Sequence, residues 1–370
     1  MRFSTSKTEL QQALQKVSKA TPTRSTLPIL GCVLLEATEE KTTLRATDLE
    51  ITIDVEMSIS LERAGSTALP LKTLLDITTE LPETRLTLSV DEKNKAQIST
   101  DSGVYDLMGK PADEFPQTIE NEDSDSVQIS SDLLKSVIDA TSFAVSRDEL
   151  KPAITGVLFR FNPNGLTAVS TDGHRLVRYT RTDFTSGSFA GDMIIPRKFL
   201  LFISTQITTG TVELFFGKSH LTAKSGQDTI LTRLIDERFP DYENVIPKDN
   251  NKTFSVDKSI LLGAIKRVSI FSNKSTHQVA LSLNKDECKI TTEDPEQSSK
   301  ALEIIPGDFD GEPINIGYNA EYLKDVVLHI KGDRAVVKLN TPISAALFSQ
   351  ELSEDNVDSL MLLMPIRLND

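Results

Sequence analysis

The sequence of 370 residues lacks features that several common protein classes require. Its only two cysteines, Cys32 and Cys288, lie in apolar, strand-like contexts, which excludes a disulfide framework and a cysteine zinc site and suits a reducing compartment. The first residues contain no apolar signal-peptide core, and no apolar run approaches the roughly 18 residues of a membrane span. These absences predict a soluble, cytoplasmic protein.

Positive charge is also in short supply. The chain has 40 Lys and Arg against 54 Asp and Glu, a net charge of -14, so the molecule as a whole does not attract nucleic acid. Any DNA contact requires a local basic surface. Residues 7–24 carry four basic residues against one acid, and residues 257–274 show the same balance. A solvated helix face explains either segment alone, and the recurrence makes a surface that faces phosphate an alternative, although the middle copy weakens the pattern.

Sequence motifs of common enzymes are missing. There is no P-loop, no G-x-S-x-G and no G-x-G-x-x-G, and the four histidines show no metal-ligand spacing. The densest polar motif is Thr171-Asp-Gly-His-Arg-Leu176, in which Asp172 and His174 invite a catalytic interpretation. A turn between strands, with polar side chains bonded to local backbone, explains the motif more simply. A metal-independent hydrolase using Asp172 and His174 remains an alternative.

Internal repeats organise the chain. Thr47-Asp48 recurs as Thr171-Asp172, and Phe115-Pro116 recurs as Phe239-Pro240, each 124 residues later. A third copy, the most diverged, begins at Phe254. Polar stretches at residues 121–126 and 247–252 separate the copies. We therefore expect three similar domains, at residues 1–126, 127–249 and 250–370.

Each copy shows the same predicted order of elements. A strand precedes a helix, which in the first copy begins at a capping box formed by Ser6 and Glu9. Strand-like runs follow, and Pro70 and Pro196 each precede a second helical pattern. Further strands close each copy. The pattern predicts an α+β fold whose few helices lie on one side of antiparallel sheets.

The C-terminus is unusually apolar for a chain end. Residues 360–368 read as a last strand, but Pro365 argues against an interior strand beyond it, so Met364 to Leu368 should lie at a sheet edge or over a surface. Methionine and branched side chains there suit an adaptable groove for an apolar peptide. Phe239-Pro-Asp-Tyr242 is either a turn alone or one wall of such a groove.

Several motifs in a fixed order resemble those of one family, the bacterial DNA polymerase III beta subunit, which is the replication sliding clamp. The resemblance extends over essentially the whole chain. The motifs that carry it are Thr26-Leu-Pro-Ile-Leu-Gly31, Thr47-Asp-Leu-Glu50, Thr171-Asp-Gly-His-Arg-Leu176, Ile195-Pro-Arg-Lys198, Arg238-Phe-Pro-Asp-Tyr242, Ile316-Gly-Tyr-Asn319 and Met364-Pro-Ile-Arg-Leu368.

The resemblance implies a DNA-clamp fold and a protein without catalytic residues, cofactor or metal. Two chains would join head to tail into a ring that encircles duplex DNA, with helices lining the interior and antiparallel sheets outside. The ring would tether the replicative polymerase for processivity. By matched position, the residues implied to face DNA are Arg24, Lys151, Arg197 and Lys198, although Pro152 and Ala153 stand where some relatives carry aromatic residues.

The resemblance also implies a groove between the second and third domains, where the polymerase catalytic subunit, the clamp loader and repair proteins insert short apolar motifs. Asn244 and Ala345 depart from residues common in the family, so partner affinity could differ. The matching groove residues are Ile154, Thr171, Gly173, His174, Arg175, Leu176, Pro240, Val245, Asn319, Tyr322, Ile343, Met364, Pro365, Ile366 and Arg367.

For the interface between the two chains of the ring, the resemblance implies that Ile77, Tyr105 and Leu107 of one subunit meet Ile270 and Phe271 of the other. A three-domain scaffold that never touches DNA is a further alternative. It predicts that the protein leaves closed circular DNA as readily as linear DNA.

Overall fold

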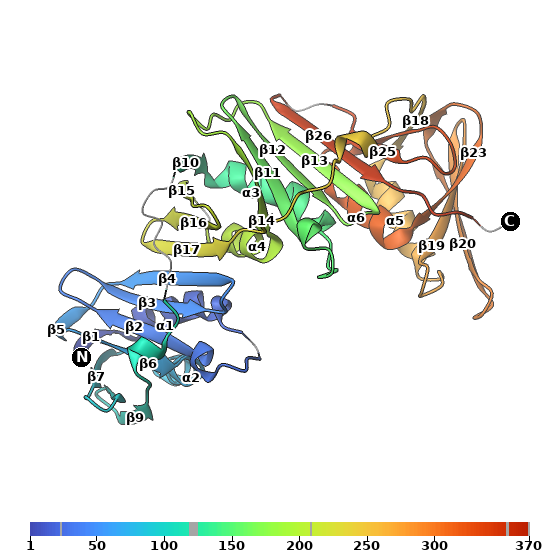
Figure 1. Ribbon diagram of the computed structural model, residues 1–370. Helices are drawn as coiled ribbons and strands as arrows, with labels where there is room; N and C mark the ends of the chain where they lie inside the picture. The colour runs from blue at the N-terminus through green and yellow to red at the C-terminus, as the bar shows by residue number, and fades with distance from the viewer. Residues whose placement is uncertain (23, 118–124, 208, 353–354, 369–370) are drawn as a thin grey trace. The chain divides into compact units, whose positions relative to one another are not determined.

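The computed structural model describes residues 1–370 except 23, 118–124, 208, 353–354 and 369–370 (Figure 1). Its contacts divide the chain into two compact units, which are described separately. The first unit comprises Met1–Leu134 and Lys198–Leu234, and the second comprises Lys135–Arg197 and Ile235–Asp370. Residues 121–124 of the predicted linker at 121–126 lie outside the described residues.

The first unit contains an antiparallel five-stranded sheet in the order β5-β1-β7-β8-β9 and an antiparallel eight-stranded sheet in the order β10-β15-β16-β17-β4-β3-β2-β6, counted over the described residues. Its elements are β1 (Arg2–Ser6), α1 (Lys7–Val17), β2 (Cys32–Ala37), β3 (Thr42–Thr47), β4 (Ile51–Met57), β5 (Ser60–Arg63), β6 (Gly65–Pro70), α2 (Leu71–Glu80), β7 (Arg85–Val90), β8 (Lys95–Ser99), β9 (Val104–Met108), β10 (Asp125–Ser130), α4 (Arg197–Gln206), β15 (Thr211–Phe216), β16 (His220–Ser225) and β17 (Asp228–Arg233).

The second unit contains a nine-stranded sheet in the order β14-β11-β12-β13-β26-β25-β24-β18-β22 and a four-stranded sheet in the order β21-β20-β19-β23, again antiparallel throughout the described strands. Its elements are α3 (Ser131–Thr141, which begins in the first unit), β11 (Gly156–Asn162), β12 (Gly165–Thr171), β13 (Arg175–Arg181), β14 (Gly191–Pro196), β18 (Lys252–Asp257), α5 (Lys258–Ser269), β19 (Gln278–Asn284), β20 (Glu287–Asp294), β21 (Ser299–Pro306), β22 (Asp308–Asp310), β23 (Ile314–Asn319), α6 (Ala320–His329), β24 (Arg334–Leu339), β25 (Ala346–Gln350) and β26 (Val357–Leu363).

Each of the two large sheets joins strands from neighbouring sequence repeats. Strands β17 and β4 pair in the first unit, and β13 and β26 pair in the second. The middle repeat therefore contributes strands to both units. Backbone hydrogen bonds between these paired strands make each large sheet continuous across two repeats.

The sequence predicts the helix starts well. The hydroxyl of Ser6 accepts the backbone N–H of Glu9 at 3.1 Å and so caps α1. The Glu9 carboxylate accepts the N–H of Ser58 at 3.2 Å. In a capping box this carboxylate would instead accept the N–H of Ser6. Pro70 and Pro196 directly precede α2 and α4 as expected.

The helices bury their apolar faces against one side of the sheets. In the first unit α1 contacts α2, β3 and β4, and in the second unit α5 contacts α6 and β18 to β21 (Figure 1). The core beneath α5 and α6 includes Phe254, Tyr318 and Phe348, all nearly inaccessible. The predicted α+β class, with helices packed on antiparallel sheets, is confirmed. Within the described residues, every helix is too short or too polar to cross a membrane.

Candidate functional site

An apolar row crosses the nine-stranded sheet of the second unit on the face away from α5 and α6. Leu176 on β13 pairs with Leu362 on β26, which pairs in turn with Leu347 on β25. Thr171 continues the row on β12, where it pairs with Leu176. Side chains alternate along a strand, so these four residues lie on one face. Leu360, two residues before Leu362, extends the same apolar cluster.

The segment after the middle repeat covers part of this row. Tyr242 is buried in the cluster, and Phe239 packs against it with an edge-to-face ring contact to Tyr242 at 6.4 Å. Burial raises the pKa of Tyr242, which keeps its hydroxyl protonated. Pro240 is exposed, and the side chain of Val245 remains 54% exposed. Phe239-Pro-Asp-Tyr242 is therefore part of an apolar wall.

Exposed apolar side chains lie at the margin of this cluster. Ile343, two residues from the buried Ala345, is 65% exposed, and Met364 at the end of β26 is 41% exposed. Scattered exposed apolar residues are normal, but several beside one half-covered apolar row form a surface that can bury a partner's apolar side chains. We call the row of Leu176, Leu362 and Leu347, together with its exposed neighbours, the apolar groove, after the peptide groove that the sequence predicts here.

The Thr171–Leu176 motif is a turn held by its own side chains, as expected. The hydroxyl of Thr171 donates to the carbonyl of Arg175 at 2.7 Å. One carboxylate oxygen of Asp172 accepts the backbone N–H groups of His174 and Arg175 at 2.9 and 3.0 Å. Gly173 has a φ of +89°, a conformation that glycine adopts without strain. These hydrogen bonds account for the motif without a catalytic role, and the turn holds His174 in an exposed position.

His174 borders the groove through its backbone, and its ring contacts α6. Its ring is stacked on that of Tyr322 with centroids 5.5 Å apart. Its carbonyl accepts the backbone N–H of Met364 at 2.8 Å. The exposed turn of the middle repeat is thus bonded directly to the C-terminal segment.

Arg175 behaves differently from the exposed His174 beside it. Only 8% of its surface is exposed, and its guanidinium donates to Asp172, Asp325 and the carbonyl of Phe143 at 3.0, 2.6 and 2.8 Å. A guanidinium whose three nitrogens are all engaged in this way is fixed in place.

The C-terminal segment runs along the edge of β23. The N–H of Ile366 donates to the carbonyl of Gly317 at 2.9 Å, and a side chain at Gly317 would meet the Ile366 carbonyl oxygen at 2.7 Å. This confirms the expected edge position of the segment after Pro365. Pro365 and Ile366 are half-buried, and Arg367 is exposed.

Two further predicted groove residues have structural roles. The side chain of Asn319 caps α6 by accepting the N–H of Glu321 at 2.9 Å, which fixes the helix that carries Tyr322. Ile154 is buried at the end of a short 3₁₀ helix, Pro152–Ile154.

Sequence reasoning missed Leu347, Leu360 and Leu362, which form much of the groove floor. The apolar run Leu360–Leu363 in β26 was a usable signal, because residues two apart on a strand, such as Leu360 and Leu362, share a face. It also missed Phe143 and Asp325, which no local pattern connects to Arg175.

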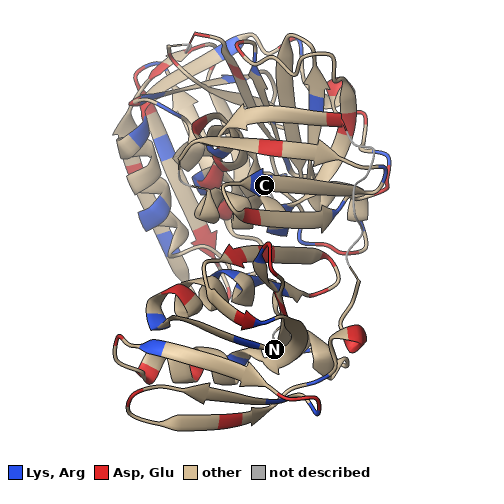
Figure 2. Cartoon of the chain, turned by 90° about the vertical axis from the view of Figure 1, so that its left-hand side faces the viewer, with Lys and Arg blue, Asp and Glu red and all other residues tan. Residues whose placement is uncertain are grey.

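The four residues predicted to face DNA are divided between the units. In the first unit Arg24 is exposed, and Lys198 forms an ion pair with Asp48. In the second unit Lys151 is exposed, while Arg197 is half-buried and donates to the carbonyl of Ser142 at 2.9 Å. Burial, followed by nearby Arg147 and Arg175, lowers the pKa of Arg197. Basic and acidic residues are interspersed on both units (Figure 2).

Of the residues predicted for a subunit interface, all but Ile77 lie on or beside two sheet edges, β9 and β21. Tyr105 and Leu107 are half-buried on β9, an edge strand of the five-stranded sheet, and Ile77 is half-buried on α2. Ile270 and Phe271 are exposed at the end of α5. The sequence interpretation missed exposed apolar residues on the edges themselves, namely Val104 and Met108 on β9 and Leu302 and Ile304 on β21.

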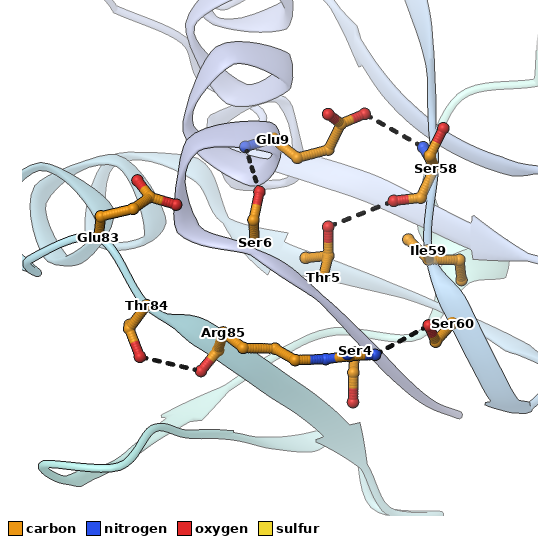
Figure 3. A pocket seen from close by; sticks show the side chains of 10 residues that line it. All are labelled: Ser4, Thr5, Ser6, Glu9, Ser58, Ile59, Ser60, Glu83, Thr84 and Arg85. Atoms are coloured by element: carbon orange, nitrogen blue, oxygen red, sulfur yellow. Dashed lines mark hydrogen bonds between the residues drawn. The ribbon is translucent and has the colours of Figure 1, made fainter.

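An open depression of about 580 Å³, lined mainly by residues with polar side chains, lies in the first unit beside the start of α1 (Figure 3). The hydroxyl groups that line it mostly form hydrogen bonds within the protein. Thr5 donates to the carbonyl of Ser58, and Ser60 accepts from Arg85. The described residues contain no cluster of His, Cys, Asp and Glu suited to a metal ion.

Comparison with known proteins assigns the architecture. Family models of the DNA polymerase III beta subunit match the chain in three parts: the N-terminal domain at residues 1–119, the central domain at residues 128–241 and the C-terminal domain at residues 243–367. The beta sliding clamp of Pseudomonas putida is 33% identical over the full length of both chains.

Solved structures agree over the full length of both chains. The DNA polymerase III subunit beta of Pseudomonas aeruginosa has a TM-score of 0.93 at 30% identity, and the sliding clamp of Bacillus subtilis has a TM-score of 0.94 at 26% identity. The fold is therefore the three-domain clamp fold. The chain belongs to the DNA polymerase III beta subunit family, the sliding clamps of that polymerase, which are processivity factors and not enzymes.

Proposed function

We propose that the protein forms a head-to-tail homodimeric ring around duplex DNA in the cytoplasm and holds the replicative polymerase on its template. In this proposal the polymerase catalytic subunit, the clamp loader and repair proteins dock through short apolar motifs in the apolar groove. The three domains correspond to residues 1–126, 127–249 and 250–370.

The apolar groove carries the docking part of the proposal. It combines a continuous floor of leucines with exposed apolar side chains such as Val245 and Ile343 and with the polar turn at His174. A small number of apolar side chains buried in such a site can supply most of the binding free energy of a short peptide.

The test is a fluorescence-anisotropy titration with a peptide of the Gln-Leu-x-Leu-Phe type. We expect saturable binding that is lost on truncation of residues 364–370 and weakened by Val245→Asp or Ile343→Asp, since both side chains are already exposed and tolerate a charge in the free protein. Leu352→Asp is the matched control, because Leu352 is 81% exposed on a separate loop. Binding unaffected by the truncation and both groove variants would contradict the proposal.

Two exposed strand edges support the homodimer. Unpaired edge strands with exposed apolar residues invite pairing with another chain, and β9 and β21 are both such edges. Pairing β9 of one subunit with β21 of another would bury Val104, Met108, Leu302 and Ile304 while bringing Ile270 and Phe271 close to the partner. Because the two edges differ, the contact would be heterologous and could close a two-membered ring only by being made twice.

Light scattering tests this interface. Phe271→Asp and Ile304→Asp should give monomers at concentrations at which the unaltered chain and Leu352→Asp remain dimers. Dimers in all four proteins would remove this assignment.

Topological retention tests the DNA part. A ring holds duplex DNA without tight contacts, so basic residues such as Arg24, Lys151, Arg197 and Lys198 need contribute only weak, sequence-independent attraction. After loading, we expect retention on closed circular DNA and release when the circle is cut. Equal release from circular and linear DNA would favour a scaffold that does not encircle DNA.

A further inference from the structure

Arg175 lies at the centre of a junction between the middle and third repeats within the second unit. From the middle repeat it contacts the carboxylate of Asp172 and the carbonyl of Phe143. From α6 of the third repeat it contacts the carboxylate of Asp325, at 2.6 Å. One buried guanidinium therefore links segments that are far apart in the sequence.

Two aromatic rings lie against the same guanidinium. Its central carbon lies 4.8 Å from the ring centroid of Tyr322 and 5.4 Å from that of Phe143. Each ring is stacked on a histidine in turn: Tyr322 on His174, and Phe143 on His329 with centroids 3.7 Å apart and planes 7° from parallel. The result is a series of five contacting side chains, and His174 at one end is bonded through its backbone to Met364 beside the groove.

The helix geometry explains how α6 enters this stack. Tyr322, Asp325 and His329 are three and then four residues apart, so they lie on one face of the helix. The ring of His329 is also held by a 2.7 Å hydrogen bond to the carbonyl of Asp325. This face of α6 meets Arg175 and Phe143 together, and a shift of the helix would disturb both contacts.

The strand geometry connects the stack to the groove. Arg175 and Leu176 are consecutive on β13, so their side chains point to opposite faces of the sheet. Leu176 forms the groove floor on one face, while Arg175 is locked into the junction on the other. His174, immediately before them, stacks on Tyr322 and accepts the N–H of Met364.

We infer that Arg175, Asp325 and Phe143 are positioning residues for the apolar groove: they fix the third repeat against the middle repeat and thereby set the spacing of His174, Leu176 and Met364, without contacting the bound peptide. This inference rests on the proposed docking function. It assigns Arg175 a role different from that of the groove residues that meet a partner.

The test measures peptide affinity by anisotropy in the full-length protein. Asp325→Ala should weaken binding about tenfold, because the guanidinium loses one of its charged partners and the junction loosens. Asp325→Glu, which restores the carboxylate, should recover most of the affinity. The matched control is Lys324→Ala on the same helix, where Lys324 pairs only with its near neighbour Glu321 in the interactions described, and it should bind as the unaltered chain does.

A double-mutant cycle separates positioning from direct contact. Phe143→Leu should also weaken binding, and its effect should not add to that of Asp325→Ala because both act through Arg175. Additive losses would mean that Asp325 touches the peptide itself and would overturn the inference. So would unchanged affinity in Asp325→Ala, or a failure of Asp325→Glu to restore it.

Thermal unfolding provides the remaining control. A role confined to stability would lower the melting temperature of Asp325→Ala and leave the affinity of the folded protein unchanged, which also counts against the inference. If the unaltered chain binds no peptide, the docking function itself fails, and this inference fails with it. If only this inference fails, the unaltered chain and Asp325→Ala both bind the peptide normally, so the two failures can be distinguished.

Discussion

The same turn occurs in the first and middle repeats, and it has the same hydrogen bonds in both. The hydroxyls of Thr47 and Thr171 each accept the N–H two residues later, at 3.1 Å, and donate to the carbonyl four residues later, at 3.0 and 2.7 Å. The carboxylates of Asp48 and Asp172 each accept the N–H groups two and three residues later. The backbone scaffold has thus been retained in both repeats.

The side chains carried by this scaffold differ. In the middle repeat the row beginning at Thr171 continues through Leu176, Leu362 and Leu347. In the first repeat the equivalent row beginning at Thr47 continues through Thr52, Leu231 and Thr222. Thr52 is further bonded to Thr47, hydroxyl to hydroxyl, at 2.9 Å.

The two equivalent rows therefore differ in polarity. A hydroxyl that loses water without gaining a partner costs free energy, whereas a leucine gains from burial. If the apolar groove binds peptides as proposed, the residues at these strand positions should limit binding to the row of the middle and third repeats.

Leu176→Thr removes this difference most directly, because Thr52 is the equivalent residue of the first repeat. Leu176 is buried, so the loss of its volume and the burial of a hydroxyl should cost about 2 to 4 kcal/mol of folding free energy. Peptide binding should fall below detection. Urea denaturation and anisotropy measure the two effects. Thr52→Val in the first repeat is the control, and it should leave peptide binding unchanged.

Gly317→Ala tests the C-terminal wall of the groove. The added carbon would meet the carbonyl oxygen of Ile366 and a methyl group of Leu368, both at 2.7 Å, so the segment must move away from β23. We expect about tenfold weaker peptide binding, equivalent to about 1.4 kcal/mol, with the rest of the fold intact. Gly332→Ala, at a turn remote from this segment in sequence, controls for general effects of replacing glycine. Unchanged peptide affinity in Gly317→Ala would show that the segment's position is not needed.

The third residue of the turn provides a smaller test. Leu49 has a φ of +77° and is 57% exposed, whereas Gly173 occupies the equivalent position at +89°. A left-handed conformation costs a leucine about 1 kcal/mol relative to glycine. Leu49→Gly should therefore stabilise the protein slightly, and Gly173→Ala should destabilise it by about 1 kcal/mol, although no atom lies within 4 Å of the added carbon. Denaturation midpoints that shift in the same direction for both variants would contradict this explanation.

Local sequence patterns predicted the parts of this comparison that depend on neighbouring residues. The turn at Thr171, the helix cap at Ser6 and the edge position after Pro365 all follow from residues within a few positions. The groove floor does not, because its leucines become neighbours only when β13 pairs with β26, and alternation identifies a face but not a partner strand. The burial of Arg175 was equally hidden, since it depends on Asp325, 150 residues away.

The caps of the first helices extend the comparison to the third repeat, with the smallest expected effect. The hydroxyl of Ser6 caps α1, whereas the carboxylate of Asp257 caps α5 by accepting the N–H of Ile260 at 2.9 Å. A hydrogen bond from the Ser259 hydroxyl, followed by that from Ile260, lowers the pKa of Asp257 below its usual value of 3.8. The folded state therefore binds the proton less tightly than the unfolded state does, so this stabilisation is present above pH 3.8 and is lost as the pH falls through the lowered pKa. Asp257→Ser replaces the carboxylate with the neutral cap of the first repeat. In denaturation at a series of pH values, the stability difference between Asp257→Ser and the unaltered chain should shrink in acid, and a difference that is constant from pH 7 to acid would show that the charge of this cap contributes nothing.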